Sequence, residues 1–458
     1  MITTAIILDA GKGTKLWPYA QIRSKGMVPI CNKPVLRHLV DALKNIGVSE
    51  IIIVGGAHAA GVRNHFRNDE GVRVIEDKNP RGPVFSLCTA FANAEAKEYI
   101  NGDFVALFGD TLVTQGDLKA LAEARSLPAV LASPLHGRSN DCITCNVRGE
   151  RATGFVGHPR GGSDGHWCAG FALSREHMAL LEANSGRFTL TQVGMMPPLE
   201  GFIEMSLNDF LKDGGEIAAV VTKDHTVDID KPWHILEAEY ACKKRLCGAL
   251  KENVLAEGAG IHGSAVIDGF VQLREGSQIG RGVIINGRVI VGKNSKIRNG
   301  AIIHGNCVIG DDTTIENYCY LDDASVGNRC YIGHGAELGG IIWDKVYLYH
   351  YMEISGIVGD NVDIGAATVC GSLRFDDGVT RHRIKGRLEA EHEGGDACFV
   401  GDYCRTGVNA ILMPGVKTGV YSVVGAGVLL RHDLEDNTLI YAEQTHVKKA
   451  WGPEMYGW

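Results

Sequence analysis

The chain has 458 residues, with 46 basic and 54 acidic side chains and a formal net charge of −8. This length exceeds what one hydrophobic core usually supports, so at least two domains are expected. The negative balance argues against a general nucleic-acid or anionic-membrane surface, and no apolar run approaches the length of a membrane span.

The first 230 residues alternate between apolar runs and helical patterns. Apolar runs at 6–8, 51–54 and 104–108 predict strands, and an apolar stripe of helical spacing covers 36–46. The alternation predicts a mostly parallel, doubly wound α/β sheet of the Rossmann-like type. Ligands bind such sheets at the carboxyl ends of the strands, where the polar turns 11–14 and 109–110 are expected.

The start of the chain, MITTAIILDAG, lacks the basic region of a signal peptide and is expected to be a first strand. The thirteen cysteines are an odd number scattered through a long chain. They are expected to be reduced thiols of a cytoplasmic protein.

Helical periodicity over 231–253 predicts a connecting helix, and a different period begins after it. Eleven aliphatic residues then stand six apart, which is typical of a parallel β-helix with about 18 residues in each coil. We therefore predict a left-handed parallel β-helix over 254–432. The aliphatic residues are Ile261, Ile267, Leu273, Ile279, Ile285, Val291, Ile297, Ile303, Ile309, Ile315 and Leu321.

Two segments depart from this period. Residues 372–397 are charged and poor in aliphatic side chains, so a loop thrown out from a coil is expected there. The tail, 433–458, is expected to cap the open end of the rod through Trp451, Tyr456 and Trp458.

A Gly-rich turn follows the first predicted strand. It contains Gly11, Lys12, Gly13, Thr14 and Lys15, so backbone N–H groups and two ammonium groups would converge on one turn. Such a turn is a phosphate cradle. The segments RSKGMVPI, from residue 23, and NKP, from residue 32, add further cations.

With these segments, residues 1–240 resemble the sugar-1-phosphate nucleotidyltransferases, whose motifs run GxGTRxxP, PKPMxPI and KP. The resemblance implies transfer of a nucleotidyl group from a nucleoside triphosphate to a sugar 1-phosphate, with release of pyrophosphate. Lys15 would contact the β and γ phosphates, and Lys25 the reacting phosphates. It also implies Mg²⁺ held by Asp110 and by either Asp228 or Asp230, since hard carboxylate oxygens suit this ion.

Other positions depart from the family pattern. Gly157-His158-Pro159 replaces a Glu-Lys-Pro, which assigns His158, with Lys25 and Gly170, to the sugar phosphate. Asn79-Pro80-Arg81-Gly82-Pro83 stands where relatives recognise the base, which assigns Gly82 to the nucleotide.

The rod is similar to the acyltransferase half of the bifunctional N-acetylglucosamine-1-phosphate uridylyltransferases and their archaeal-type relatives. The match is GDNVDIGAAT, from residue 359, and RFDDG, from residue 374, beside their GDNVNIGAGT and NYDG. It implies acyl transfer from acetyl-CoA, with His350 as catalytic base and Asp363 and Arg381 at the acyl-acceptor site. It also implies a homotrimer, or a dimer of trimers, formed through the rod.

Three hypotheses follow. The first is an enzyme that makes a nucleotide sugar, with UDP-N-acetylglucosamine as the leading product. The second is a CoA-dependent acyltransferase acting on an amino sugar, whose front domain binds a nucleotide but has little or no activity. The third is a non-catalytic trimeric assembly or regulatory protein.

Overall fold

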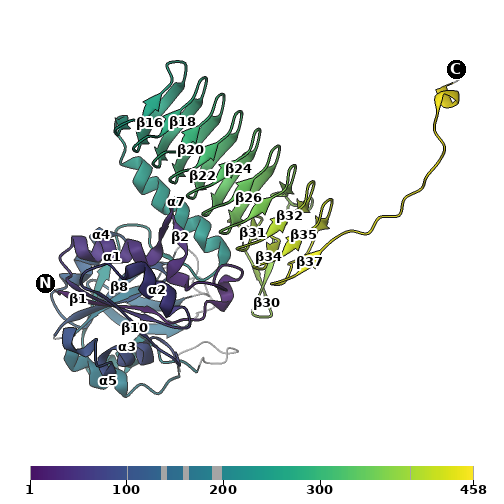
Figure 1. Ribbon diagram of the computed structural model, residues 1–458. Coiled ribbons are helices and arrows are strands. Elements are labelled where there is room, and N and C mark those ends of the chain that lie inside the picture. The colour runs from purple at the N-terminus through teal and green to yellow at the C-terminus, as the bar shows by residue number, and fades with distance from the viewer. Residues whose placement is uncertain are drawn as a thin grey trace.

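The computed structural model describes residues 2–100, 102–135, 142–157, 165–187, 199–391 and 393–456. Over these ranges the chain forms an α/β domain and a rod of stacked coils, and helix α7 (Pro232–Gly248) packs between them (Figure 1). Within the same ranges, no helix combines the length and the apolar character needed to cross a membrane.

The α/β domain is built on a mixed sheet. Its described strands follow the order β5-β4-β1-β6-β11-β8-β12-β10-β9. The first four are parallel, but β11 is antiparallel to both β6 and β8, so the expectation of a mostly parallel sheet was wrong in this half. A two-residue turn joins β9 to β10, and a turn that short permits only antiparallel pairing. The strands are β1 (Thr4–Asp9), β4 (Glu50–Gly55), β5 (Val72–Glu76), β6 (Phe104–Phe108), β8 (Ala129–Pro134), β9 (Ile143–Arg148), β10 (Arg151–Gly157), β11 (His166–Leu173) and β12 (Ile217–Val221).

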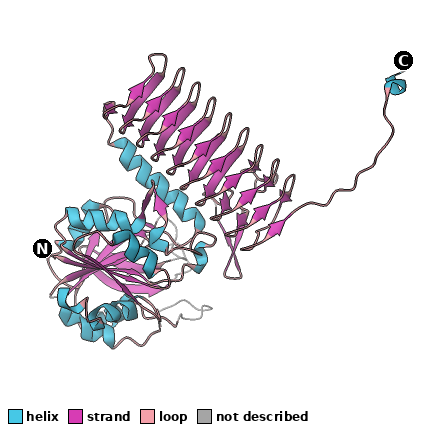
Figure 2. Cartoon of the chain, in the orientation of Figure 1, coloured by secondary structure: helices cyan, strands magenta, loops and turns pink. Residues whose placement is uncertain are grey.

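Helices cover both faces of this sheet, which confirms the doubly wound arrangement (Figure 2). Successive side chains of a strand point to opposite faces. Accordingly, Ile7 belongs to the apolar cluster under α1, α2 and α4, whereas Ile6 belongs to the cluster under α3, α5 and α6. The helices are α1 (Val35–Asn45), α2 (Ala59–Phe66), α3 (Pro83–Ala92), α4 (Gln115–Ala122), α5 (Met178–Glu182) and α6 (Ile203–Lys212).

Short elements occupy the connections. Two of them are antiparallel ribbons, which pair β2 with β3 and β7 with β13. The short elements are η1 (Thr14–Leu16), η2 (Lys25–Met27), β2 (Pro29–Ile30), β3 (Lys33–Pro34), η3 (Lys97–Tyr99), β7 (Thr111–Leu112), η4 (Arg175–His177) and β13 (Val227–Asp228). One more, η5 (Pro453–Tyr456), lies in the C-terminal tail.

The rod is a parallel β-helix, as the six-residue period predicts. Ile285 pairs in register with Ile303, and Ile303 with Leu321, so each coil stacks its aliphatic side chains on the next. After Leu321 the aliphatic spacing in the sequence slips by one residue. The structure explains this slip, because the coil becomes one residue shorter where Ile315 pairs with Ile332.

One sheet of the rod contains β14 (Val254–Leu255), β16 (Val266–Leu273), β18 (Ile284–Val291), β20 (Ile302–Ile309), β22 (Tyr320–Val326), β24 (Glu337–Ile342), β26 (Glu353–Val358), β28 (Val369–Cys370), β31 (Cys398–Val400), β33 (Ile411–Leu412), β34 (Lys417–Thr418) and β36 (Leu429–Leu430). The other contains β15 (Gly260–Ile261), β17 (Gln278–Ile279), β19 (Lys296–Ile297), β21 (Thr314–Ile315), β23 (Tyr331–Ile332), β25 (Tyr347–Leu348), β27 (Asp363–Ile364), β32 (Arg405–Thr406), β35 (Val423–Val424) and β37 (Leu439–Ile440).

Glycines stack at one bend of the rod, and one of them gives a stability prediction. Gly287 has φ 148°, and a Cβ there would lie 2.7 Å from the carbonyl carbon of Gly305. We expect Gly287→Ala to lower the free energy of unfolding by about 3 kcal/mol, measured by urea denaturation. The matched control is Gly282→Ala, which also has positive φ but meets no atom within 4 Å, and which should cost about 1 kcal/mol. Equal losses would contradict the stacking argument.

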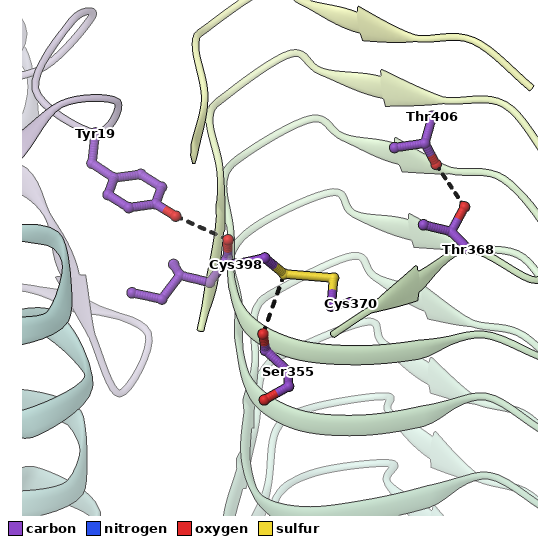
Figure 3. Close-up of a disulfide and its surroundings, with 7 residues drawn as sticks. Tyr19, Ser355, Thr368, Cys370, Cys398 and Thr406 are labelled. Carbon is purple, nitrogen blue, oxygen red and sulfur yellow. Dashed lines mark hydrogen bonds between the residues drawn. A yellow bond between two sulfur atoms is a disulfide. The ribbon is translucent and has the colours of Figure 1, made fainter. Parts of the chain in front are cut away.

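The expected excursion lies between β28 and β31 and contains a hairpin that the sequence did not reveal, formed by β29 (Arg381–Ile384) and β30 (Arg387–Ala390). Both ends of the excursion pair with β26, which brings Cys370 and Cys398 together. They form a disulfide, with their Cα atoms 6.2 Å apart (Figure 3). The expectation that all cysteines are reduced was therefore wrong for this pair, because their proximity depends on how the coil closes.

The tail does not cap the rod in the expected way. After β37 it runs away from the coils (Figure 1), and Trp451 is 71% exposed. The side chain of Tyr456 and the whole of Trp458 lie outside the described residues. Trp451 lies beyond β37, the last strand of the rod that pairs with a neighbouring coil, so the repeat of the coils does not determine its position.

Candidate active site

The Gly-rich turn emerges from the carboxyl end of β1, as predicted. Gly11, Lys12 and Thr14 are exposed there, and η1 begins at Thr14. Gly13 has φ 63°, a left-handed conformation that favours glycine. A Cβ at Gly13 would lie 2.9 Å from Cγ of Lys25, so this glycine lets the Lys25 side chain pass close to the turn.

Two lysines of this region meet two aspartates from distant parts of the chain. Lys15 Nζ lies 2.7 Å from Oδ2 of Asp230. Lys25 Nζ lies 3.3 Å from the other oxygen of Asp230 and forms an ion pair with Asp110. Burial alone would lower the pKa of Lys25, but Asp110 and Asp230 raise it well above its ordinary value, so Lys25 remains a cation.

The short ribbon of β7 and β13 brings the carboxylates together. Asp228 pairs with Thr111, and the N–H of Ile229 donates to the carbonyl of Asp110 at 3.0 Å. Burial, and then the negative charge of Asp110, raise the pKa of Asp228 to about 7. Burial would also raise the pKa of Asp230, but Lys25 and Lys15 hold it well below its usual range.

Asp110, Asp228 and Asp230 lie close enough for their negative charges to repel one another, so binding of a cation between them is favoured. Their carboxylate oxygens are ligands that suit magnesium. Among the described residues, no three or more His, Cys, Asp and Glu side chains form a group that could hold a metal ion. Magnesium usually needs only one or two protein carboxylates, with water and substrate phosphates completing its shell. Asp110 and Asp228 meet this requirement, whereas both oxygens of Asp230 already contact lysines.

Asp9 has a role that the motifs do not reveal. Its side chain is buried at the end of β1, and its Oδ1 accepts a hydrogen bond from the N–H of Gly26 at 3.0 Å. Burial raises the pKa of Asp9 to about 7. Through its hydrogen bond with Gly26, which follows Lys25 directly, the carboxyl group of Asp9 fixes the turn that carries Lys25.

The other residues assigned to this site have different surroundings. Gly82 precedes α3 with φ 107°, and a Cβ there would lie 2.6 Å from the backbone nitrogen of Gly201, so it permits a close backbone approach. Gly170 lies buried within β11, where a Cβ would lie 2.7 Å from Leu107 Cδ2. His158 lies outside the described residues.

A pocket beside the carboxylates contains side chains that sequence reasoning missed. Asp228 and Asp230 line it together with Trp167, His225 and Glu237. Nε2 of His225 lies 2.8 Å from Oε1 of Glu237. Only the nearness of His225 to the Val-Asp-Ile-Asp motif could have indicated this position.

The residues assigned to acyl transfer lie on the rod. His350 is exposed just after β25, and its ring contacts Tyr351 at 5.6 Å between centroids. Asp363 lies in β27, which pairs with β25, so these two residues belong to neighbouring coils. Arg381 lies on the hairpin, whose His382 ring packs 4.6 Å from Trp233 of α7.

Comparison with known proteins covers both parts of the chain. A model of the MobA-like NTP transferase domain matches residues 5–195, and a model of the GMPPB C-terminal domain matches 251–374. The "Bifunctional protein GlmU" of Methanococcus maripaludis is 30% identical over 446 residues, 95% of this chain and 97% of the relative. The chain belongs to the GlmU family.

The chain is also similar to more distant proteins. The "Bifunctional sugar-1-phosphate nucleotidylyltransferase/acetyltransferase" of Sulfurisphaera tokodaii is 21% identical and aligns over 94% of this chain and 98% of its own length. A solved UDP-glucose pyrophosphorylase complexed with UDP-glucose is 18% identical, with a TM-score of 0.46 over 54% of this chain and all of the other. The expected nucleotidyltransferase domain of a GlmU-like enzyme is confirmed by the family model and the full-length relatives.

Proposed function

We propose that this GlmU family member transfers a nucleotidyl group from a nucleoside triphosphate to a sugar 1-phosphate and releases pyrophosphate. The observation that carries the proposal is the meeting of Lys15 and Lys25 with Asp110 and Asp230 beside the Gly-rich turn. The reaction requires cations around the phosphoryl oxygens and needs no protein nucleophile.

Each group has a task in this chemistry. The N–H groups of the Gly-rich turn and Lys15 bind the triphosphate and orient pyrophosphate as the leaving group. Lys25 would bind the phosphate of the sugar and the α-phosphate of the nucleotide together. Its ammonium group lies between Asp110 and Asp230, beside the turn that binds the triphosphate. Asp110 and Asp228 would hold a magnesium ion, which when bound neutralises charge on the phosphate oxygens.

The leading product is UDP-N-acetylglucosamine, which the resemblance to the bifunctional N-acetylglucosamine-1-phosphate uridylyltransferases implies. The name of the Sulfurisphaera tokodaii relative supports the wider class, transfer to a sugar 1-phosphate. The test measures pyrophosphate release with each common nucleoside triphosphate against glucose, glucosamine and N-acetylglucosamine 1-phosphates. Turnover with UTP and N-acetylglucosamine 1-phosphate at the highest kcat/KM supports the product. Turnover with another pair supports the reaction but not this product, and no release with any pair contradicts both.

We also infer acyl transfer from acetyl-CoA to an amino sugar on the rod. It is supported by the exposed His350 on the coil next to Asp363, and by an alignment with GlmU that includes the rod. If His350 is the base, His350→Ala should lower the rate of thiol release by about 100-fold or more. The control is His304→Ala, another exposed rod histidine, 2.8 Å from Asp322. Equal rates for wild type and His350→Ala would remove His350 from the mechanism.

Membership in an enzyme family argues against the third hypothesis, a non-catalytic assembly. The homotrimer formed through the rod and the cytoplasmic location stay predictions.

A further inference from the structure

The segment that joins the two site lysines packs against the rod. Tyr19 lies between Lys15 and Lys25 in the chain and is fully buried, and its hydroxyl donates to the carbonyl of Ile357 at 2.9 Å (Figure 3). Two residues earlier, Trp17 Nε1 donates to Oδ1 of Asp436 at 2.9 Å. The turn that brings the lysines into the site is therefore braced from outside its own domain.

Arg23 makes the most extensive of these contacts. Its Nη2 lies 2.7 Å from Asp402 and 2.9 Å from Asp360, and its guanidinium group lies 4.7 Å from the centre of the Trp343 ring. The Arg23 side chain is 12% exposed and that of Asp402 is fully buried. Removing one partner of such a buried pair leaves an uncompensated charge, so the contact is costly to break.

The rod carboxylates are themselves fixed by the coil ladder. Oδ1 of Asp402 accepts from the N–H of Asp360 at 2.6 Å, and Oδ1 of Asp360 accepts from the N–H of Asp344 at 2.8 Å. Arg23 is thus tied to a rigid stack of coils and not to a mobile surface.

The carboxylate half of the site is braced in the same way. Lys231, which follows Asp230 directly, is 4% exposed, and its Nζ lies 2.6 Å from Glu389 on the rod hairpin. The rings of Trp233 and His382 pack 4.6 Å apart beside it. The segment that carries Lys15 and Lys25 and the segment that carries Asp228 and Asp230 are therefore both anchored on the rod.

We propose that Arg23 is a positioning residue of the nucleotidyl-transfer site, through which Asp360 and Asp402 of the rod hold Lys15 and Lys25 in place. This inference rests on the proposed function. Arg23 acts through the backbone of its segment, because its side chain points to the rod carboxylates. A displacement of about 1 Å in a reacting group can cost a hundredfold in rate, so fixing this segment matters for turnover.

The chain offers a closely matched control. Arg37 also forms an ion pair with a carboxylate, 2.6 Å from Asp69, and its guanidinium group lies 4.4 Å from the centre of the Phe66 ring. Arg37 belongs to α1, and its partners Asp69 and Phe66 both lie in the α/β domain. Arg37→Met therefore removes the same kind of interaction without touching the rod.

The experiment compares Arg23→Met, Asp402→Asn and Arg37→Met in the full chain. For Arg23→Met and Asp402→Asn we expect kcat for pyrophosphate release to fall about tenfold to a hundredfold. The KM for the sugar 1-phosphate should change less than about threefold, because the ground-state contacts remain. Arg37→Met should keep the wild-type kcat, and Arg23→Lys should restore part of the loss by keeping one charge. An equal kcat in Arg23→Met and Arg37→Met would overturn the proposal.

Amide hydrogen exchange gives a second readout that does not depend on turnover. Peptides covering 11–25 should exchange faster in Arg23→Met and Asp402→Asn than in wild type or Arg37→Met, because the anchor of this segment is lost. Unchanged exchange in this segment would refute the positioning role even if the wild type released no pyrophosphate. An inactive wild type with faster exchange in the variants would instead refute only the proposed function.

Discussion

Replacing Lys25 by methionine is expected to lower kcat for pyrophosphate release by about a thousandfold. Its ammonium group lies between Asp110 and Asp230, where it would stabilise the charge that develops on the phosphoryl oxygens. Such a fixed cation is effective because it needs no reorganisation during the reaction. The measurement is steady-state pyrophosphate release at saturating substrates.

The control for this change is Lys44→Met, which removes a lysine of α1 whose Nζ lies 3.4 Å from Asp69. It should keep the wild-type rate. Lys25→Met also deprives two partly buried carboxylates of their cation, so its melting temperature should fall, and circular dichroism must show that the fold persists. Lys25→Arg keeps the charge and should recover part of the activity. Turnover of folded Lys25→Met within about tenfold of wild type would contradict the role of this lysine.

The second large effect is expected for Asp110→Asn, which should reduce the magnesium-dependent rate by at least about a hundredfold. An amide oxygen is neutral and attracts a divalent cation less strongly than a carboxylate. The variant also relieves repulsion between Asp110 and Asp228, since Asp110 raises the pKa of Asp228. It also removes the ion pair of Asp110 with Lys25, but Lys25 keeps Asp230 as a partner, so the fold should persist despite the loss of activity.

Two measurements check this expectation together. Pyrophosphate release is followed against magnesium concentration, and melting temperatures are recorded with and without magnesium and nucleotide. The thermal shift produced by magnesium with nucleotide should be present in wild type and absent in Asp110→Asn. Asp41→Asn, which changes a carboxylate 2.8 Å from Lys33 on the surface, serves as the control. A full magnesium response in Asp110→Asn would rule out the metal assignment.

The sequence predicts well where a pattern is local. The six-residue spacing from Ile261 to Leu321 corresponds to the side chains that stack inside the rod, because each coil repeats the same backbone path. The Gly-rich turn lies at the end of β1 for a similar reason, since strand and turn are adjacent in the chain.

Other features depend on contacts between distant segments. The antiparallel placement of β11 and the hairpin of β29 and β30 are not marked by periodicity, because strand direction depends on the path of the connections. The pairing of Cys370 with Cys398 follows from their common neighbour β26, which neither cysteine identifies by its spacing.

The sequence by itself determined a nucleotidyltransferase-like front half, a coiled rod and the lysines and aspartates that serve as candidates for the site. Only the tertiary structure decided that Lys25 meets Asp110 and Asp230. It also decided that the Arg23 side chain points away from the site and contacts the rod. The physical reason is that repeats and turns are encoded by neighbouring residues. Charge pairing, in contrast, depends on how separate segments pack, and these partners are far apart in the chain.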